Sequence, residues 1–225
     1  MRIIHWDLKP WRNILKNQYL RNPEAIYDRS FEIIEEEADL LRFPQEFRSL
    51  VTRLIHSCGM VDLQEQIRFH PKAVEQGVLA LSNGGAVICD SMMVYKGIIK
   101  RHLPSENQVQ CWIEESSVIE HAQTKGITRS MAAVDLWSSE LEDSVIAIGN
   151  APTALFRLLE LLEEGARPPA LILGFPVGFV GAAESKQLLE KEATRMDIPY
   201  VTVLGRRGGS AMASAAVNAI ARGVS

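Results

Sequence analysis

The chain has 225 residues, of which 47% are hydrophobic and 23% are charged, and its formal net charge is −4 at pH 7. This length predicts one substantial core, and the composition is that of a globular protein and not of a disordered one. The acidic balance gives no basic field over the whole molecule, which argues against nucleic acid as the main partner, although a local group of arginines could still hold a small anion.

Cysteine usage and the lack of long apolar stretches point to the cytoplasm. Cys58, Cys89 and Cys111 are odd in number and no C-x-x-C occurs, which argues against a disulfide framework and against a zinc or other metal site. The N-terminus, MRIIHWDLKPWRN, interleaves charges with apolar residues and therefore differs from a signal peptide. No stretch is long and apolar enough to span a membrane, so we expect no membrane partner.

Residues 1 to 23 are interpreted as an N-terminal extension without an assigned role, and residues 24 to 225 as a single domain. A first helix is predicted from Pro23, where proline suits the first turn and apolar residues recur at helical spacing with acids between them. The apolar face of this helix is expected to contain Ile26, Phe31, Ile33, Ile34 and Ala38.

A second helix is predicted from Pro44 to Gly59, and it carries the first candidate for chemistry. Arg53 and His56 lie at the edge of its apolar stripe and three positions apart, so they are neighbours on one face and could address one ligand together. The alternative is that His56 is a partly buried helix residue without a chemical role, since histidine is of intermediate burial.

Five short, uniformly apolar runs follow and alternate with helical patterns. Strands buried on both faces lose the alternation of polar and apolar residues, so these runs predict a doubly wound, mostly parallel sheet of about five strands covered by helices on both sides. The predicted strands are AVICD from Ala86, VQCWI from Val109, VIAIG from Val145, ALILG from Ala170 and YVTVLG from Tyr200.

Glycines at the strand ends indicate where a ligand would bind. Gly149, Gly174 and Gly205 each follow a predicted strand directly. In open α/β sheets the ligand lies beyond the carboxyl ends of the strands, where glycine lets the backbone approach it and helices present free N–H groups. We therefore expect the site to be assembled from these ends.

Two of the loops at these ends are predicted to begin helices. Asp90 is interpreted as a cap of the helix that follows it, and Thr128 as the cap of the helix that begins at Arg129. Asn150 and the N–H groups after Gly149 either face a ligand carbonyl or carboxylate or only form a well-made helix start. His102 and His121 are surrounded by polar residues and are expected to face solvent.

The last two loops suggest a broad ligand with anionic groups. GFPVGFVG could offer an apolar wall through Phe175, Val177 and Phe179. GRRGGSA, which contains Arg206, has the composition of an anion cradle at a helix start, although a solvated arginine pair would look the same. Neither a P-loop nor a G-x-G-x-x-G fingerprint is present, so nucleotide chemistry is not supported.

Taken together, RLIHSCGMVD, GITRSMAAV, VIAIGNAPTALF, GFPVGFVGAAESK and GRRGGSAMASAA resemble, in this order and spacing, the precorrin-8X methylmutase family, also called cobalt-precorrin-8 methylmutase. The resemblance covers roughly residues 23 to 222. It implies a flavodoxin-like, three-layer α/β/α fold, a homodimer, and an isomerase of cobalamin biosynthesis that moves a methyl group from carbon 11 to carbon 12 of a corrinoid polycarboxylate, with no separate cofactor.

The resemblance also assigns residues. His56 matches the family's catalytic histidine, which protonates the ring C nitrogen, and such a role suits an imidazole because it exchanges a proton near neutral pH. Ser30 and Arg53 match substrate-contacting positions, and Arg129 matches an arginine that holds a substrate carboxylate. The Asn150 and Arg206 loops are given only a general place around the ligand. A non-catalytic tetrapyrrole carrier and an enzyme that binds a phosphorylated metabolite at GRRGGSA remain as alternatives.

Overall fold

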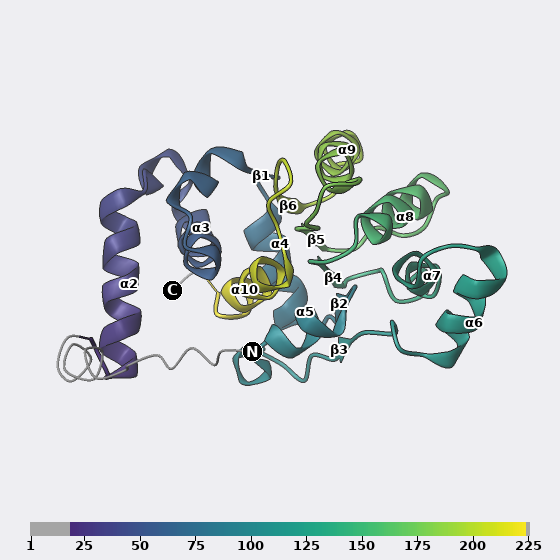
Figure 1. Ribbon diagram of the computed structural model, residues 1–225, viewed down its shortest axis with the longest axis horizontal. Coiled ribbons are helices and arrows are strands. Elements are labelled where there is room, and N and C mark those ends of the chain that lie inside the picture. The colour runs from purple at the N-terminus through teal and green to yellow at the C-terminus, as the bar shows by residue number, and fades with distance from the viewer. Residues whose placement is uncertain (1–18, 224–225) are drawn as a thin grey trace, which may run out of the picture.

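The computed structural model of the protein describes residues 19–223, so most of the predicted extension, and residues 224–225, lie outside the described part. Within that part, no helix combines the length and the apolar character that a membrane crossing requires. The helices pack on both sides of a central sheet (Figure 1). Their bounds are α2 Pro23–Glu37, α3 Gln45–Cys58, α4 Ala73–Ser82, α5 Met92–Gly97, α6 Ser116–Lys125, α7 Arg129–Asp135, α8 Pro152–Glu163, α9 Ala182–Arg195 and α10 Ser210–Ala221.

The described residues form one six-stranded sheet in the order β1-β6-β5-β4-β2-β3. All five predicted strands are present, and β1 is an additional edge strand that pairs antiparallel with β6, whereas the other pairs are parallel. Counted without β1, the parallel strands follow the flavodoxin-like order 2-1-3-4-5, which confirms the predicted fold class. The strands are β1 Ile67–Phe69, β2 Val87–Cys89, β3 Val109–Gln110, β4 Val145–Ile148, β5 Leu171–Gly174 and β6 Tyr200–Val203.

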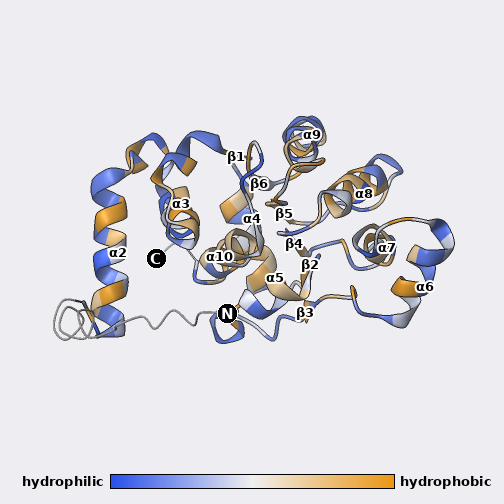
Figure 2. Ribbon diagram, viewed as in Figure 1, coloured by the Kyte–Doolittle hydropathy of each residue, from blue (hydrophilic) through white to orange (hydrophobic). Residues whose placement is uncertain are grey.

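Side chains alternate between the two faces of the sheet and form two cores. Val145 and Ala147 of β4 belong to a core shared with α3, α4 and α10, whereas Ile146 and Ile148 belong to a core shared with α7, α8 and α9. Because both faces are covered, each residue of β4 is buried and the strand reads as one apolar run. Figure 2 shows the hydrophobic residues concentrated in the strands and in α10.

Helices α2 and α3 pack against each other at one end of the molecule, with α2 outermost (Figure 1). The Asn22 side chain accepts a hydrogen bond from the Ala25 N–H at 2.9 Å and begins α2, and Gly59 ends α3 with a left-handed φ of 69°. The predicted apolar face of α2 is only partly correct. Ile34 is buried, but Ile26 and Ile33 are 46% and 36% exposed, because α2 lies against one helix and not against the sheet.

The expectation for Asp90 is corrected by the structure. Ser91, and not Asp90, caps α5 through a hydrogen bond from the Val94 N–H. The buried Asp90 carboxylate instead accepts hydrogen bonds from the N–H groups of Gly149 at 3.0 Å, Asn150 at 2.9 Å and Ala151 at 2.8 Å, between the ends of β2 and β4. Of the two alternatives for these N–H groups, the structure excludes the one in which they bind a ligand, because Asp90 already accepts their hydrogen bonds.

Candidate active site

His56 lies in the last turn of α3 and is held by three side chains of α2. Its Nδ1 lies 2.8 Å from the Ser30 hydroxyl oxygen, and its ring centroid lies 5.5 Å from that of Tyr27 and 5.4 Å from that of Phe31. The imidazole itself is exposed, and Nε2 has no hydrogen-bond partner within residues 19–223. Ser30 and the two aromatic rings thus orient the imidazole and leave Nε2 open to a ligand.

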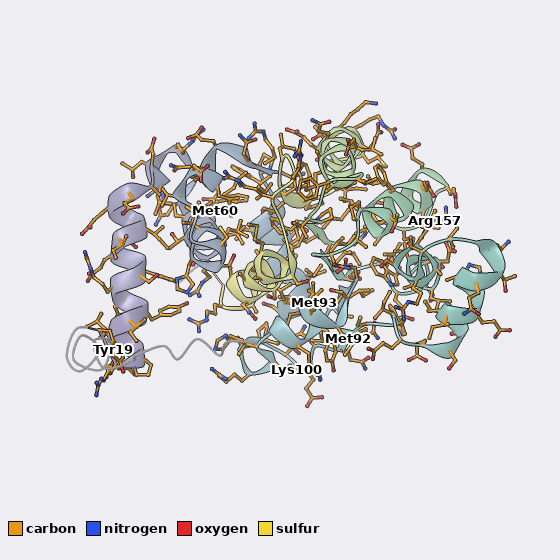
Figure 3. All side chains as sticks on the ribbon, viewed as in Figure 1. Tyr19, Met60, Met92, Met93, Lys100 and Arg157 are labelled. Carbon is orange, nitrogen blue, oxygen red and sulfur yellow. The ribbon has the colours of Figure 1, made fainter. Side chains whose placement is uncertain are left out.

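Arg53 lies one turn before His56 on α3, and both side chains face α2, as their three-residue spacing predicts. Its guanidinium group donates to the Tyr27 hydroxyl oxygen and lies over the rings of Phe31 and Tyr27, at 5.3 and 5.8 Å from their centroids. In the described part of the chain, Arg53 Nε is buried without a hydrogen-bond partner. Figure 3 shows side chains of α2 and α3 reaching into the space between the two helices.

Two cavities meet at His56. One has a volume of about 190 Å³ and is mostly apolar, and the other has a volume of about 310 Å³ and is rich in basic groups. The first is lined by Ser30, Ile33, Ile34, Glu37, Ile55, His56, Gly59 and Val61. The second is lined by Tyr27, Arg53, His56, Ser57, Ile99, Arg101, His102, Ala215, Asn218 and Arg222.

The structure brings Ser30, Arg53 and His56 together, but Arg129 and Asn150 form a separate group. Arg129 is the exposed first residue of α7, and Asn150 is exposed at the end of β4. The cap residue Thr128 joins the two loops because its hydroxyl oxygen lies 2.8 Å from that of Thr153. Figure 1 places α7 across the sheet from α2 and α3, so within one protomer this group lies away from His56.

Arg206 lies on a third part of the surface, on a pair of loops that are fastened together. Its guanidinium group lies 5.3 Å from the centroid of the exposed Phe179 ring. The Gly178 N–H donates to the Arg206 carbonyl, and a Cβ at Gly208 would lie 2.4 Å from the Phe175 carbonyl oxygen. Phe175 itself is fully buried, so its expected place in an apolar ligand wall is wrong and only the exposed residues of this loop can contact a ligand.

Lys186 of α9 binds the backbone of the loop that carries Arg206. The side chain is fully buried in the first turns of α9 and donates to the Arg207 carbonyl, while Arg207 pairs with Asp62 at 2.7 Å. Burial lowers the pKa of Lys186 to about 8. A buried ammonium group therefore fixes the backbone of the loop that carries Arg206.

Lys186 also predicts a pH dependence of stability. The folded protein holds this proton less tightly than the unfolded chain, in which the pKa of lysine is about 10.4, so the free energy of unfolding should rise by about 2 kcal/mol between pH 8 and pH 10. Denaturant unfolding of the wild type and of Lys186→Met at both pH values measures this rise as the difference between the two proteins. An equal pH dependence in both proteins would contradict it.

Several residues around His56 were not predicted from the sequence. Tyr27 and Phe31 flank Ser30 at helical spacing on α2, and Phe31 was assigned to the buried face because helical periodicity cannot distinguish packing on a core from packing on a site residue. His102 was expected to face solvent but lines the basic cavity. His121, also expected in solvent, bonds Asp135 at 2.9 Å.

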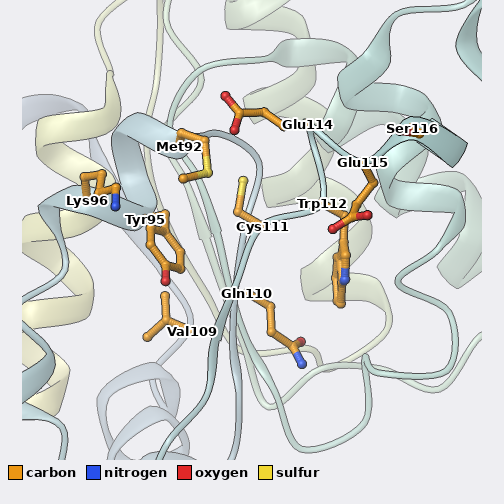
Figure 4. A pocket seen from close by; sticks show the side chains of 10 residues that line it. All are labelled: Met92, Tyr95, Lys96, Val109, Gln110, Cys111, Trp112, Glu114, Glu115 and Ser116. Carbon is orange, nitrogen blue, oxygen red and sulfur yellow. The ribbon is translucent and has the colours of Figure 1, made fainter. Parts of the chain in front are cut away.

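Another cavity, of about 460 Å³, lies at the edge strand β3 and does not include His56 (Figure 4). Met92, Tyr95 and Lys96 of α5 stand on one side of it and Trp112, Glu114 and Glu115 on the other, with Cys111 between them. Within residues 19–223, no three histidine, cysteine or acidic side chains are grouped so that they could hold a metal ion. The residues of this cavity therefore do not contribute to the His56 site.

Comparisons with known proteins agree with this fold over almost its whole length. The sequence profile of the precorrin-8X methylmutase family matches residues 25–223. The precorrin-8X methylmutase of Pseudomonas aeruginosa is 52% identical over 203 residues, which are 90% of this chain and 97% of that protein. The cobalt-precorrin-8 methylmutase of Priestia megaterium is 38% identical over 199 residues, which are 88% of this chain and 87% of that protein.

A solved structure leads to the same family. The crystal structure of the precorrin-8X methylmutase from Thermus thermophilus superposes with a TM-score of 0.78 at 34% identity, and the match covers 88% of this chain and 95% of that one. The family profile covers nearly all of α2 and the whole of α3, the two helices that carry His56 and its contacts. The chain belongs to the precorrin-8X methylmutase family, the isomerases that catalyse a methyl shift in cobalamin biosynthesis.

Proposed function

We propose that this chain moves a methyl group from carbon 11 to carbon 12 of precorrin-8X or of cobalt-precorrin-8, and that His56 carries the proton of the reaction. The observation that carries this proposal is the oriented imidazole of His56, with Nδ1 on Ser30 and Nε2 open between two cavities. The relatives named for precorrin-8X and for cobalt-precorrin-8 are both similar to this chain, so both forms of the substrate are included.

The contact with Ser30 engages Nδ1 and leaves Nε2 as the nitrogen that exchanges the proton with the substrate. In the charged imidazole, Nδ1–H donates to the Ser30 hydroxyl oxygen and Nε2–H faces the substrate. Nε2 donates this proton to the ring C nitrogen, the bond from carbon 11 to the methyl group breaks as the bond to carbon 12 forms, and the proton returns. The product is an isomer of the substrate, and no separate cofactor takes part.

The remaining predicted residues bind the rim of the macrocycle. Arg53 places a guanidinium group beside His56, and an arginine matches a carboxylate with two parallel hydrogen bonds. Arg129, Asn150 and Arg206 are the further substrate-binding residues of this proposal. In one protomer they lie on other loops, and a homodimer resolves this separation if a partner supplies its Arg129 group to the His56 site.

The homodimer draws support from the exposed apolar surface. Phe179 and Val180 are 84% and 89% exposed, and Leu41 is 79% exposed, and a second copy would cover such side chains. Sedimentation of the full chain at micromolar concentration tests this part of the proposal. All three cysteines are free, which fits the proposed cytoplasmic location.

The test of the proposed function is direct conversion. The purified full chain should change the visible absorption of precorrin-8X to that of hydrogenobyrinic acid without added nucleotide or metal, and the cobalt form should be converted likewise. Binding of the product without any turnover of either substrate would overturn catalysis and would instead support a tetrapyrrole carrier.

A further inference from the structure

We propose that Arg101 and Arg222 bind a carboxylate side chain of the macrocycle in the 310 Å³ cavity beside His56. This inference rests on the proposed function and adds two substrate-binding residues to it. The residues come from the end of α10 and from η3, a short 3-10 helix over Lys100–His102.

Asn218 of α10 brings the two arginines to the same cavity. Its side-chain oxygen accepts a hydrogen bond from the Ile99 N–H at 2.8 Å, and its side-chain nitrogen donates to the Gly97 carbonyl at 3.0 Å. These bonds fasten the turn between α5 and η3 to α10. Arg101 therefore lies near Arg222, which follows the last residue of α10.

The charges around this cavity favour an anion. Its ten lining residues include three arginines and two histidines and no acid, in a chain whose net charge is −4. Arg222 lies 3.3 and 3.2 Å from the two ring nitrogens of His102, so two basic side chains contact each other there. Burial and then the charges of Arg222, Arg101 and Arg53 lower the pKa of His102. A bound carboxylate would offset this repulsion.

The position of His56 indicates which part of the substrate reaches the arginines. His56 lines both cavities, so a macrocycle whose ring nitrogen faces Nε2 has its edge over the apolar cavity on one side and over the basic cavity on the other. The acetate and propionate groups lie at the rim of the ring. A cavity of about 310 Å³ accommodates one such short side chain with its carboxylate at the guanidinium groups.

Steady-state kinetics of Arg101→Met and Arg222→Met test this inference. Each variant should raise KM for precorrin-8X about tenfold with kcat changed less than about twofold, because the lost charge-assisted bond is made in the ground state and in the transition state alike. Both arginines are exposed, so methionine should not disturb the fold. Arg167→Met is the matched control, since Arg167 is an exposed arginine that pairs with Glu142, and KM should not change.

Two binding measurements separate a carboxylate contact from a general effect on the protein. Hydrogenobyrinic acid should bind both variants about tenfold more weakly, whereas its fully esterified form should bind wild type and variants equally. In NMR titrations of the wild type, the acid should raise the pKa of His102, and this rise should be smaller in both variants.

The outcomes distinguish this inference from the proposed function. Turnover by the wild type with unchanged KM in both arginine variants would overturn the inference alone. Equal loss of affinity for the acid and for its ester would also overturn it, because the arginines would then act on packing. A wild type that converts neither form of the substrate would overturn the proposed function and this inference with it.

Discussion

Substitution of His56 with alanine is expected to lower kcat by about 10² to 10⁴, the usual contribution of one general acid. The imidazole is exposed and its main contacts are to α2, so the fold should remain intact. His56→Asn should lose as much activity as the alanine variant, because an amide can still contact Ser30 but cannot carry a proton at neutral pH. Single-turnover conversion of precorrin-8X, followed by absorption, measures both effects.

His121→Ala is the matched control for this experiment. His121 likewise lies on a helix and bonds a nearby side chain, Asp135, and 39% of its side chain is exposed, but it does not line either cavity at His56. Its loss should leave kcat within about twofold of the wild type. Full activity of His56→Ala would exclude His56 as the proton carrier and leave the family and fold unaffected.

Asp90→Ala should lower the free energy of unfolding by about 3 kcal/mol, more than Asp90→Asn or Ser91→Ala. The substitution leaves the N–H groups of Gly149, Asn150 and Ala151 without their acceptor, and each unsatisfied buried donor costs on the order of 1 kcal/mol or more. Part of the loss is offset because a buried charge is removed as well, as the raised pKa of Asp90 through burial indicates. Denaturant unfolding measures the change.

Ser91→Ala is a suitable comparison because it removes one cap from the neighbouring helix α5. The Ser91 bond to the Val94 N–H is long, at 3.4 Å, so the expected loss is about 0.5 to 1 kcal/mol. Asp90→Asn should fall between the alanine variant and the wild type, because its one amide oxygen can still accept from the Asn150 and Ala151 N–H groups, whereas its NH2 group would face the Gly149 N–H. A cost below that of Ser91→Ala would show that the three bonds to Asp90 contribute little.

The sheet could be predicted well because burial on both faces leaves a simple pattern. Runs such as VIAIG are typical of strands that are buried on both faces, and all five predicted strands are present. The strand β1, IRF, was missed because it is three residues long, carries Arg68 and pairs only at the sheet edge with β6. The pairing of β1 depends on the position of β6, which the residues of β1 and its neighbours in the sequence do not determine.

The candidate site was predictable only where its residues share one element. Arg53 and His56 follow from helical spacing, but Ser30 lies 26 positions before His56, and its contact depends on how α2 packs on α3. The sequence indicates a helix cap at Asp90, but Asp90 instead accepts from the loop after β4, and this role depends on β2 lying next to β4. Arg101 and Arg222 are 121 positions apart, and the packing of α5 on α10, together with the bonds of Asn218 to Gly97 and Ile99, brings them to one cavity.

The hydrogen bonds of Asp90 lie where related folds bind a cofactor. In a flavodoxin-like sheet the crevice between the first and third parallel strands, here β2 and β4, is where cofactor phosphates rest on a helix N-terminus. This protein fills that position with a carboxylate of its own, so an incoming phosphate ester would meet a fixed negative charge and occupied N–H groups. The sheet therefore has the strand order of nucleotide-binding folds, but Asp90 occupies the position at which such folds bind a phosphate.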